Sequence, residues 1–472
     1  MGIHNFHKWV KQNHSECIKP ILTSIEVDHL YIDVNFCLHN VAYNTKNRSV
    51  LMKKVCTFIN NMLNIIKPTK TLTLASDGPA PYAKLILQRI RRLNISRNLD
   101  NEIDADEINP ICFTPGTKFM TEFNFTMKDF IEKIKKKYNV QVFELLKGPN
   151  EAELKIINQL LLNNNNNPND HHIILSNDAD VCVMTTVLKC YDKISIAVKL
   201  KKNIDLFEIK NFANIIDFPI NNYQKNVDLS FILLFMGNDY LPKLLYISFD
   251  SLLKSYKMAL RINKKGLINE NMTINIKFLK DLMMILSLNF KNIGWINCFS
   301  IIDFDIKLYK NYIEGLLWCV DCYKNGMCLK YDYMYEHKKS PHPLGIFYYL
   351  AFNNKIEKPI PNPEPIPDYI YALLVIPKKA KNLIDPKYHS IMDNKLKFLY
   401  EEENCKECVQ MHSKLSDLDK TIKYMITINE NFDKLREEST NLSKKLTKHK
   451  AIHKSISFND IKFVINLLKN NN

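Results

Sequence analysis

Short apolar runs alternate with amphipathic segments over the first 250 residues of the chain. Four runs have the length and the β-branched content of buried strands, namely HLYID, TLTLASD, HHIILSND and ISIAVKL. The segments MKKVCTFINNMLNIIK and EAELKIINQLLL carry apolar residues at helical spacing. Strands that alternate with helices form parallel sheets covered by helices. The pattern therefore predicts an α/β fold with a twisted, mostly parallel sheet flanked by helices.

The remainder of the chain is helical or mixed in pattern. We expect a helical connector over residues 251–300, after an α/β domain that occupies residues 1–250. A second region, residues 301–400, is rich in aromatic residues and contains KPIPNPEPIPDY, whose spaced prolines favour an extended course. Residues 401–472 are charged and have a helical pattern, so we expect a helical tail.

Carboxylates stand where three of the predicted strands end. Because the carboxyl ends of parallel strands share one edge of a sheet, these side chains are expected to meet in one crevice. Further acids stand at a predicted helix start and in the segment MGNDYLP. The candidate set is Asp33, Asp77, Glu151, Glu153, Asp178, Asp180 and Asp239.

Seven negative charges in one crevice require cations to neutralise them. Carboxylate oxygens select Mg²⁺ or Mn²⁺ over softer metals, and two such ions are the usual device for hydrolysing phosphodiesters. Each acid also has an ordinary explanation, since an aspartate after a strand is commonly a turn residue or a helix cap. Asn150 with Glu153 fits a capping box. Independent turns need not all place a carboxylate after a buried strand, so the repetition favours a metal site.

The charge of the chain points to a polyanionic partner. A formal net charge of +15 favours nucleic acid, although ribosome contacts or acidic membranes fit the same charge. No apolar run approaches the roughly 18 to 20 residues of a membrane span, and MGIHNFHKWV has no signal-peptide core. We therefore expect no membrane partner and a cytoplasmic location, with the nucleus as the alternative.

Cysteine usage indicates reduced thiols, because most of the 12 cysteines lie inside apolar stretches. Two CxxC pairs occur, Cys319 with Cys322 and Cys405 with Cys408. A zinc ion shared by the two pairs is one interpretation. The other is that the first pair simply lies on a helix face, since it has the i, i+3 spacing of a helix and follows Trp318.

A basic stripe begins just past Asp77, in DGPAPYAKLILQRIRR. Its members occupy i, i+4, i+7 and i+8, which is one face of an α-helix. Such stripes are commonly solvated faces. Beside a metal site, however, they could hold a terminal phosphate by charge-assisted hydrogen bonds. The stripe consists of Lys84, Gln88, Arg91 and Arg92.

Several of these segments resemble Xrn-type 5′-to-3′ exoribonucleases in order and spacing. The resemblance runs through MGIHNFHKWV, YIDVNFCLHN, SDGPAPYAKLILQRIRR, FTPGTKFM, GPNEAELKI, LSNDADV and FMGNDYLP. It resumes with YIEGLLWCVDCYKNG and YALLVIPKKAKNLIDPKYHSIM, and it covers about three quarters of the chain. It implies a PIN-like, flap-nuclease-type fold with a mixed helical C-terminal region, in a compact and divergent member for which a viral origin would fit.

The resemblance also implies roles for individual residues. The seven acids would bind two metal ions and carry catalysis, and the basic stripe would hold a 5′-monophosphate. His39 would stack on the terminal base, with Trp318 as the opposing aromatic residue. Trp318 fits a buried core position equally well, and the tyrosine-rich LKYDYMYEH replaces the tryptophan-rich stretch of the family. The substitute aromatics are Tyr331, Tyr333 and Tyr335.

The expected function is 5′-to-3′ hydrolysis of 5′-monophosphorylated single-stranded RNA to mononucleotides by a monomer. The chain departs from the family where Asn150 and Ala152 replace glycines, and where Leu154 replaces a histidine. One alternative is a flap-type 5′ nuclease acting on DNA, which the basic stripe and the second region disfavour. The other is a catalytically silent RNA-binding scaffold. Retention of all seven acids disfavours it, because clustered negative charge weakens RNA binding.

Overall fold

The computed structural model describes most of the chain, and all structural statements below refer to these residues. They are residues 2–43, 45, 47–97, 103–104, 108–200, 203–216, 222–269, 271–288, 305–337, 339–353, 355–427, 430–450 and 456–469.

Two compact units interleave along the sequence. The first unit comprises Met1–Val41, Lys54–Lys84 and Met127–Pro365, and the second comprises Ala42–Lys53, Leu85–Thr126 and Ile366–Asn472. The boundaries expected at residues 250, 300 and 400 do not coincide with these units. The chain leaves the first unit twice and returns to it, and a hydrophobic pattern reports local periodicity but not such long-range packing.

The first unit contains a seven-stranded sheet in the order β1-β7-β6-β5-β2-β3-β4. Strands β2 to β6 run parallel, whereas β7 is antiparallel to β6 and β1 is antiparallel to β7. The expected α/β class with a mostly parallel sheet is therefore confirmed. The strands are β1 (Ile18–Pro20), β2 (Ile25–Asp33), β3 (Ile66–Ala75), β4 (Gln141–Leu145), β5 (His172–Leu175), β6 (Ile194–Lys199) and β7 (Ile204–Glu208).

The four predicted strands are confirmed as β2, β3, β5 and β6. The sequence pattern missed β1, β4 and β7. Strands β1 and β4 form the edges of the sheet, and no residue of either strand is fully buried. An edge strand of three to five half-exposed residues carries little of the hydrophobic signal on which such a prediction depends.

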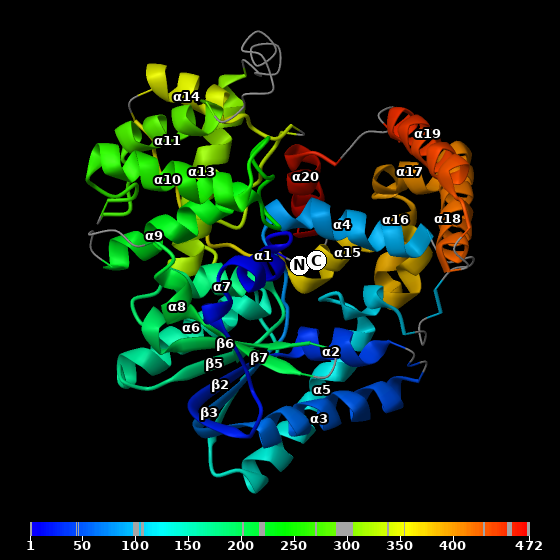
Figure 1. The fold of residues 1–472 in the computed structure, drawn as a ribbon. Helices are drawn as coiled ribbons and strands as arrows, with labels where there is room; N and C mark the ends of the chain where they lie inside the picture. The colour runs from blue at the N-terminus through cyan, green and yellow to red at the C-terminus, as the bar shows by residue number, and fades with distance from the viewer. Residues whose placement is uncertain are drawn as a thin grey trace. The chain divides into compact units, whose positions relative to one another are not determined.

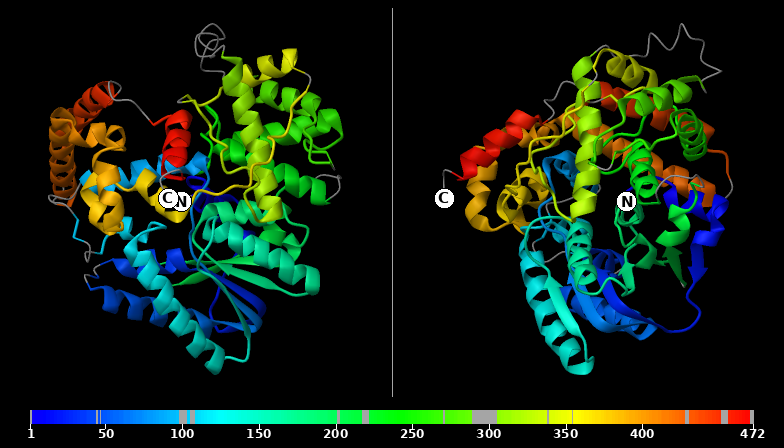
Figure 2. Two further views of the ribbon diagram at one scale, coloured as in Figure 1. Left: turned by 180° about the vertical axis from the view of Figure 1, so that it is seen from behind. Right: turned by 90° about the vertical axis from the view of Figure 1, so that its left-hand side faces the viewer.

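Helices cover both faces of the sheet (Figure 1). On one face α6 packs against β2 and β3, while α7 and α8 pack against β6. Helices α3 and α5 lie on the other side of the sheet, as the view from behind also shows (Figure 2). The helices are α2 (Val34–Ala42), α3 (Arg48–Ile65), α5 (Lys118–Lys137), α6 (Ala152–Asn166), α7 (Ala179–Thr186) and α8 (Ile209–Ala213).

The order of the strands contains a switch point between β2 and β5. The chain runs from β2 outward to β3 and β4, and then returns to form β5 on the opposite side of β2. Right-handed crossovers place the connecting helices of the two directions on opposite faces. The carboxyl ends of β2 and β5 lie at this switch point, which is where ligands bind in open α/β sheets.

Further helices complete the first unit. In the part expected to be a helical connector, residues 251–300, the structure describes two helices, and residues 289–304 lie outside the described residues. The segment KPIPNPEPIPDY runs extended until α15 begins at Asp368, and its Asn362 forms a bridge with Lys330. The helices are α1 (Phe6–Asn13), α9 (Asn222–Leu233), α10 (Phe249–Asn263), α11 (Ile276–Leu288), α13 (Ile306–Asn325) and α14 (Pro343–Phe352).

The second unit is helical and is tied together by the buried Arg89 of α4. Its guanidinium donates to the carbonyl oxygens of Leu374, at 2.9 Å, and Leu399, and it lies 5.2 Å from the ring centre of Tyr400. The tail is helical, as expected. The helices are α4 (Tyr82–Arg97, which starts in the first unit), α15 (Asp368–Val375), α16 (His389–Asp393), α17 (Glu401–Asn404), α18 (Lys406–Thr427), α19 (Asp433–Lys450) and α20 (Phe458–Lys469).

Hydropathy along these helices does not reach the level of a membrane span. Within the described residues, none combines the length and apolar content needed to cross a bilayer.

Candidate active site

Three of the predicted acids lie at the switch point of the sheet. Asp33 is the last residue of β2, is 6% exposed, and accepts a hydrogen bond of 3.0 Å from the backbone N–H of Phe36. Asp178 is the N-cap of α7, and its side chain accepts a 3.0 Å hydrogen bond from the backbone N–H of Asp180. These hydrogen bonds fix the direction in which the carboxylates of Asp33 and Asp178 point. A carboxylate can therefore cap a helix and still be a candidate metal ligand.

A second group of acids joins β3 to the start of α6. The carboxylate of Asp77 accepts a 3.0 Å hydrogen bond from the backbone N–H of Ala152, the first residue of α6. Carboxylate oxygens of Asp77, Glu151 and Glu153 all lie within 4.8 Å of one another. The capping box of Asn150 and Glu153 is wrong, because Glu151 is the N-cap and its own side chain makes no capping hydrogen bond. Both glutamates instead remain with the cluster.

The loop before α6 explains one departure from the family pattern. Asn150 has a φ of 75°, in the left-handed region that glycine favours and that asparagine tolerates better than most residues. Its side chain accepts a hydrogen bond from the hydroxyl of Tyr331, and its carbonyl accepts one of 2.8 Å from the N–H of Gly78. A side chain at Gly78 would meet the backbone of Gly148. The loop therefore keeps a glycine-like conformation without the family's glycine.

Lys84 places a positive charge inside the acid cluster. Its ammonium group donates to the carboxylate of Glu151 and lies 2.9 Å from Oδ2 of Asp239. The hydroxyl of Tyr240, next in sequence to Asp239, also donates to Glu151. Asp239, the seventh acid, is therefore linked to Glu151 of the acid cluster because both carboxylates form an ion pair with Lys84. The sequence pattern assigned Lys84 to phosphate binding and gave no sign of this ion pair or of Tyr240.

Burial and mutual repulsion shift the ionisation of the acids. Burial, together with the charges of Asp77 and Asp178, raises the pKa of Asp33 to about 8. Burial is also the main cause that raises the pKa of Glu153 and of Asp180 well above the usual range, and neighbouring carboxylates add to it in both cases. The cluster thus carries more negative charge than the protein compensates. Such a donor set fits hard divalent cations.

The excess charge predicts an unusual stability change in the Glu153→Gln variant. We expect the free energy of unfolding of the metal-free protein to rise by about 1–3 kcal/mol, because glutamine removes a charge repelled by its neighbours. The stabilisation conferred by Mg²⁺ should shrink in the same variant. Chemical denaturation with EDTA and with Mg²⁺ measures both effects.

The control for this prediction is Glu144→Gln, which removes an exposed acid that lies 3.8 Å from Lys128 and outside the cluster. We expect a change of less than about 0.5 kcal/mol there, as for an exposed ion pair. A metal-free Glu153→Gln protein less stable than wild type would mean that the Glu153 carboxylate is already compensated.

The amino-terminal backbone also belongs to the site, which sequence reasoning missed. The N–H of Ile3 donates a 3.1 Å hydrogen bond to Asp180. Gly2 has a φ of 75°, and a Cβ there would lie 2.3 Å from Oδ1 of Asp178 and 2.7 Å from Oδ1 of Asp180. Position 2 therefore requires glycine. The segment MGIHNF has no periodic pattern that would indicate this role from the sequence.

The basic stripe lies on α4, as predicted. Lys84 faces the acids, whereas Gln88 accepts a hydrogen bond from the guanidinium of Arg92, which also donates a 2.6 Å bond to the hydroxyl of Thr114. Arg91 is half-buried. Lys84 belongs to the first unit and the other three members to the second. Phosphate binding by the stripe therefore stays a prediction.

The two aromatic candidates differ in exposure. His39 is exposed on α2, as a stacking residue must be. Trp318 is 3% exposed, stacks on Tyr333 with ring centres 4.7 Å apart, and contacts Tyr240 edge-on at 5.1 Å. Its indole N–H donates a 3.0 Å hydrogen bond to the carbonyl of Lys330. Both the ring and its polar atom are satisfied inside the protein, so base stacking by Trp318 is corrected to a core role.

The tyrosines proposed as substitutes for the opposing aromatic are also largely enclosed. Tyr331 and Tyr333 are each 3% exposed, and the hydroxyl of Tyr333 donates a 2.9 Å hydrogen bond to the carbonyl of Asn311. Tyr335 is half-buried, and its hydroxyl donates to the carbonyl of Lys339 at 2.6 Å. Tyr335 is thus the most accessible of the three.

Comparisons with known proteins agree with this arrangement. Residues 1–197 match the family model described as the XRN 5′-3′ exonuclease N-terminus. The chain is 29% identical to 5′-3′ exoribonuclease 1 of Saccharomyces cerevisiae over 334 residues, which are 59% of this chain and 22% of that protein. It is 29% identical to 5′-3′ exoribonuclease 1 of Schizosaccharomyces pombe over 152 residues, or 28% of this chain and 11% of that protein. The chain thus spans less than a quarter of the length of these relatives.

Among solved structures, the catalytic core of Rad2 in complex with DNA aligns with 83% of this chain and 98% of that chain, at 14% identity and a TM-score of 0.34. A TM-score this low carries no weight for fold or function. The family match is the informative result, since its residue range contains six of the seven acids, all but Asp239. Residues 1–197 of the chain therefore resemble the N-terminal region of the XRN 5′-3′ exonuclease family.

Proposed function

We propose that the protein is a metal-dependent 5′-to-3′ exoribonuclease that hydrolyses 5′-monophosphorylated single-stranded RNA to 5′-mononucleotides. The observation that carries the proposal is the convergence of carboxylates from separate strand ends, with Asp77, Glu151 and Glu153 within 4.8 Å of one another. The names of the curated relatives supply the polarity and the substrate class.

The donor set supports Mg²⁺ or Mn²⁺, and we propose two ions held by the seven acids. When bound, such ions activate a water molecule and stabilise the leaving oxygen of a phosphodiester. The chain's own groups position these ligands. Lys84 and Tyr240 hold Glu151, the N–H of Ile3 holds Asp180, and the start of α6 holds Asp77. This fixed arrangement limits the reorganisation needed during reaction.

Selection of the 5′ end is assigned to the basic stripe of α4. A terminal monophosphate offers more charge and more acceptor oxygens than a hydroxyl does. Guanidinium groups bind phosphate through bidentate hydrogen bonds. A cap or a triphosphate is expected to be excluded by its bulk. The net charge of +15 favours binding of the RNA phosphates that follow the 5′ end.

The corresponding prediction concerns Arg91→Ala and Arg92→Ala. We expect each variant to lose most of the preference for 5′-monophosphate over 5′-hydroxyl RNA, by roughly 10- to 100-fold, since a hydrogen bond to a charged group contributes about 1.5–3 kcal/mol. Cleavage of the 5′-hydroxyl substrate should stay close to wild type. The ratio of kcat/KM values for the two RNAs measures the effect.

Arg97→Ala is the matched control, because Arg97 ends the same helix and its guanidinium donates to the side chain of Asn94. It should keep the preference. The exoribonuclease proposal fails if the wild-type protein degrades capped and monophosphorylated RNA at equal rates, or if it cuts circular RNA efficiently, because either result means that the 5′ end is not recognised.

The two rival functions are separated by the same assay. A flap-type 5′ nuclease would cleave branched DNA faster than RNA. A silent scaffold would bind RNA and release no nucleotide with Mg²⁺ or Mn²⁺. Parallel reactions with EDTA establish that any cleavage depends on the metal.

A further inference from the structure

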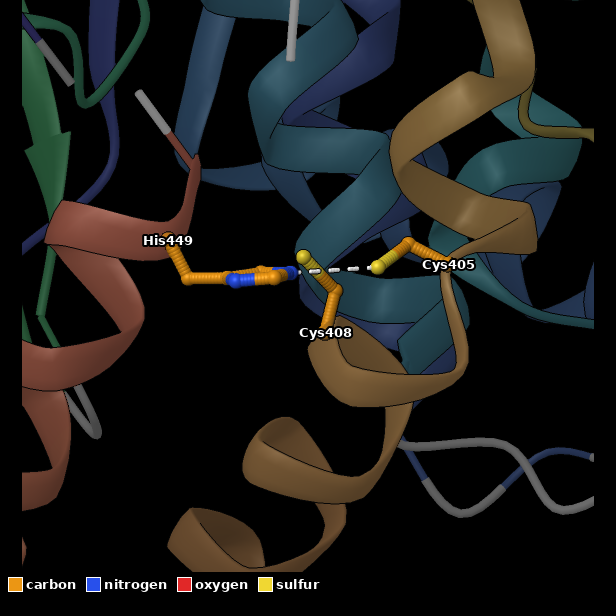
Figure 3. Close-up of side chains that lie close together, drawn as sticks. All are labelled: Cys405, Cys408 and His449. Atoms are coloured by element: carbon orange, nitrogen blue, oxygen red, sulfur yellow. Dashed lines mark hydrogen bonds between the residues drawn. The ribbon is translucent and has the colours of Figure 1, made fainter. Parts of the chain in front are cut away.

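The end of the α18–α19 hairpin carries a cluster of soft metal ligands, which we call the thiol cluster. It consists of Cys405, Cys408 and His449, whose ligand atoms all lie within 4.8 Å of one another. Figure 3 shows the imidazole of His449 pointing toward the two sulfur atoms. The Nε2 atom of His449 lies 3.2 Å from the sulfur of Cys405. The chain thus brings Cys405 and His449, which are 44 positions apart, to one point.

A carboxylate fixes the orientation of the histidine. The other ring nitrogen of His449, Nδ1, lies 3.1 Å from Oε2 of Glu407. Histidines that bind a metal commonly donate their second N–H to a carboxylate, which sets the tautomer and raises the basicity of the ligating nitrogen. Glu407 therefore presents the Nε2 lone pair of His449 toward the sulfurs of Cys405 and Cys408.

The thiol cluster adjoins the apolar core of the hairpin, since Cys408 belongs to that core and Cys405 packs against it. Further along the hairpin the two helices meet through Met411 and Leu446, with Leu415 and Leu442 beside them. Cys405 and His449 are only half-buried, although Cys408 is 1% exposed. An apolar contact between helices needs neither a histidine nor a carboxylate behind it. Two sulfurs and an oriented imidazole are the donors of a zinc site.

We propose that Cys405, Cys408 and His449 bind a zinc ion that joins the start of α18 to the end of α19. The sulfur and nitrogen donors select zinc over the hard cations that suit the acid cluster, so the two sites differ in metal. This site differs from the zinc ion shared by the two CxxC pairs, which the sequence offered as one of two interpretations.

The other CxxC pair provides an internal contrast. Cys319 and Cys322 lie on α13 in the core of the first unit and are at most 2% exposed. Burial raises the pKa of the Cys322 thiol well above its usual range, and the neighbouring Cys328 adds to the effect. Among the described residues, Cys405 and Cys408 lie beside a histidine at distances that one metal ion could span, whereas the first pair belongs to no such group. The helix-face interpretation therefore holds for Cys319 and Cys322.

The test measures metal content in the full chain. The protein is purified from zinc-supplemented cells and dialysed against a moderate concentration of EDTA to remove weakly bound metal. Mass spectrometry then measures the zinc content, and we expect about one zinc per chain. The variants Cys405→Ala, Cys408→Ala and His449→Ala should each lose it. Glu407→Gln should retain the site and weaken zinc binding by about 10- to 100-fold. Cys319→Ala is the matched control and should keep one zinc.

A second arm excludes zinc held by the acid cluster and loss through misfolding. Asp178→Asn should carry as much zinc as wild type. Substitution with Co²⁺ should give a thiolate charge-transfer band that weakens in Cys405→Ala and vanishes in the double cysteine variant. Circular dichroism establishes that the variants keep their helices. Wild-type protein without zinc, or equal zinc in wild type and the three ligand variants, would overturn the proposal, whatever the outcome of the RNA assays.

Discussion

Replacing Asp33 or Asp178 with alanine is expected to abolish RNA hydrolysis while leaving RNA binding intact or slightly tighter. Both carboxylates stand at the switch point of the sheet, and each is fixed by a 3.0 Å backbone hydrogen bond. We expect kcat to fall by at least about 10³-fold, since metal-assisted stabilisation of a developing charge contributes several kcal/mol. Binding survives because the lost carboxylate repels phosphate. Single-turnover cleavage and a filter-binding titration measure the two effects.

Asp192→Ala is the control for this experiment, because Asp192 is an exposed aspartate of the same unit, away from the strand ends that carry the acids. Its turnover should match wild type. Near-wild-type turnover in both Asp33→Ala and Asp178→Ala would remove the two-metal assignment, and the acid cluster would then be a structural feature. Loss of RNA binding together with activity would instead indicate a folding defect, which circular dichroism detects.

The strand ends show why part of the site could be predicted from sequence. Asp33, Asp77 and Asp178 follow buried strands whose apolar runs are visible in the sequence, and parallel pairing then brings their ends together. The order of the strands was not visible. The positions of β2 and β5 beside each other depend on the return of the chain from β4, which no local pattern encodes.

Other parts of the site depend on long-range contacts and were missed for that reason. Ile3 and Asp180 are 177 positions apart, and the donor is a backbone N–H, which every residue other than proline has. Lys84 carries a charge that fits a phosphate pocket and an acid cluster equally well, and only the packing of Glu151 and Asp239 around it shows the ion pair. Likewise, the sequence showed the CxxC motif of Cys405 and Cys408, but it did not indicate that His449 lies beside them.

The backbone conformation of a loop residue also could not be predicted from its residue type alone. Asn150 stands where the family pattern has glycine, yet Asn150 has a φ of 75° and its neighbour Glu151 lies with Asp77 and Glu153. The tolerance of asparagine for the left-handed region explains this result. A pattern that scores residue identity cannot distinguish such a replacement from one that would break the loop.

Trp318→Ala is expected to destabilise the protein strongly and to leave the specific activity of the folded fraction unchanged. The indole is 3% exposed, lies against Tyr240 and Tyr333, and donates to the carbonyl of Lys330. Removal of a buried tryptophan leaves a cavity and an unpaired carbonyl, and it costs about 3–5 kcal/mol of the free energy of unfolding. Urea denaturation measures this loss, and titration of active sites corrects the activity for the unfolded fraction.

Trp318→Phe separates the two contributions to that loss, because phenylalanine keeps a ring beside Tyr333 and removes the donor to Lys330. We expect it to cost less than the alanine variant does, about 1–3 kcal/mol, which reflects the unmade hydrogen bond and the smaller ring. A Trp318→Ala protein that keeps wild-type stability but turns over single-stranded RNA slowly would contradict this account and return Trp318 to the substrate path.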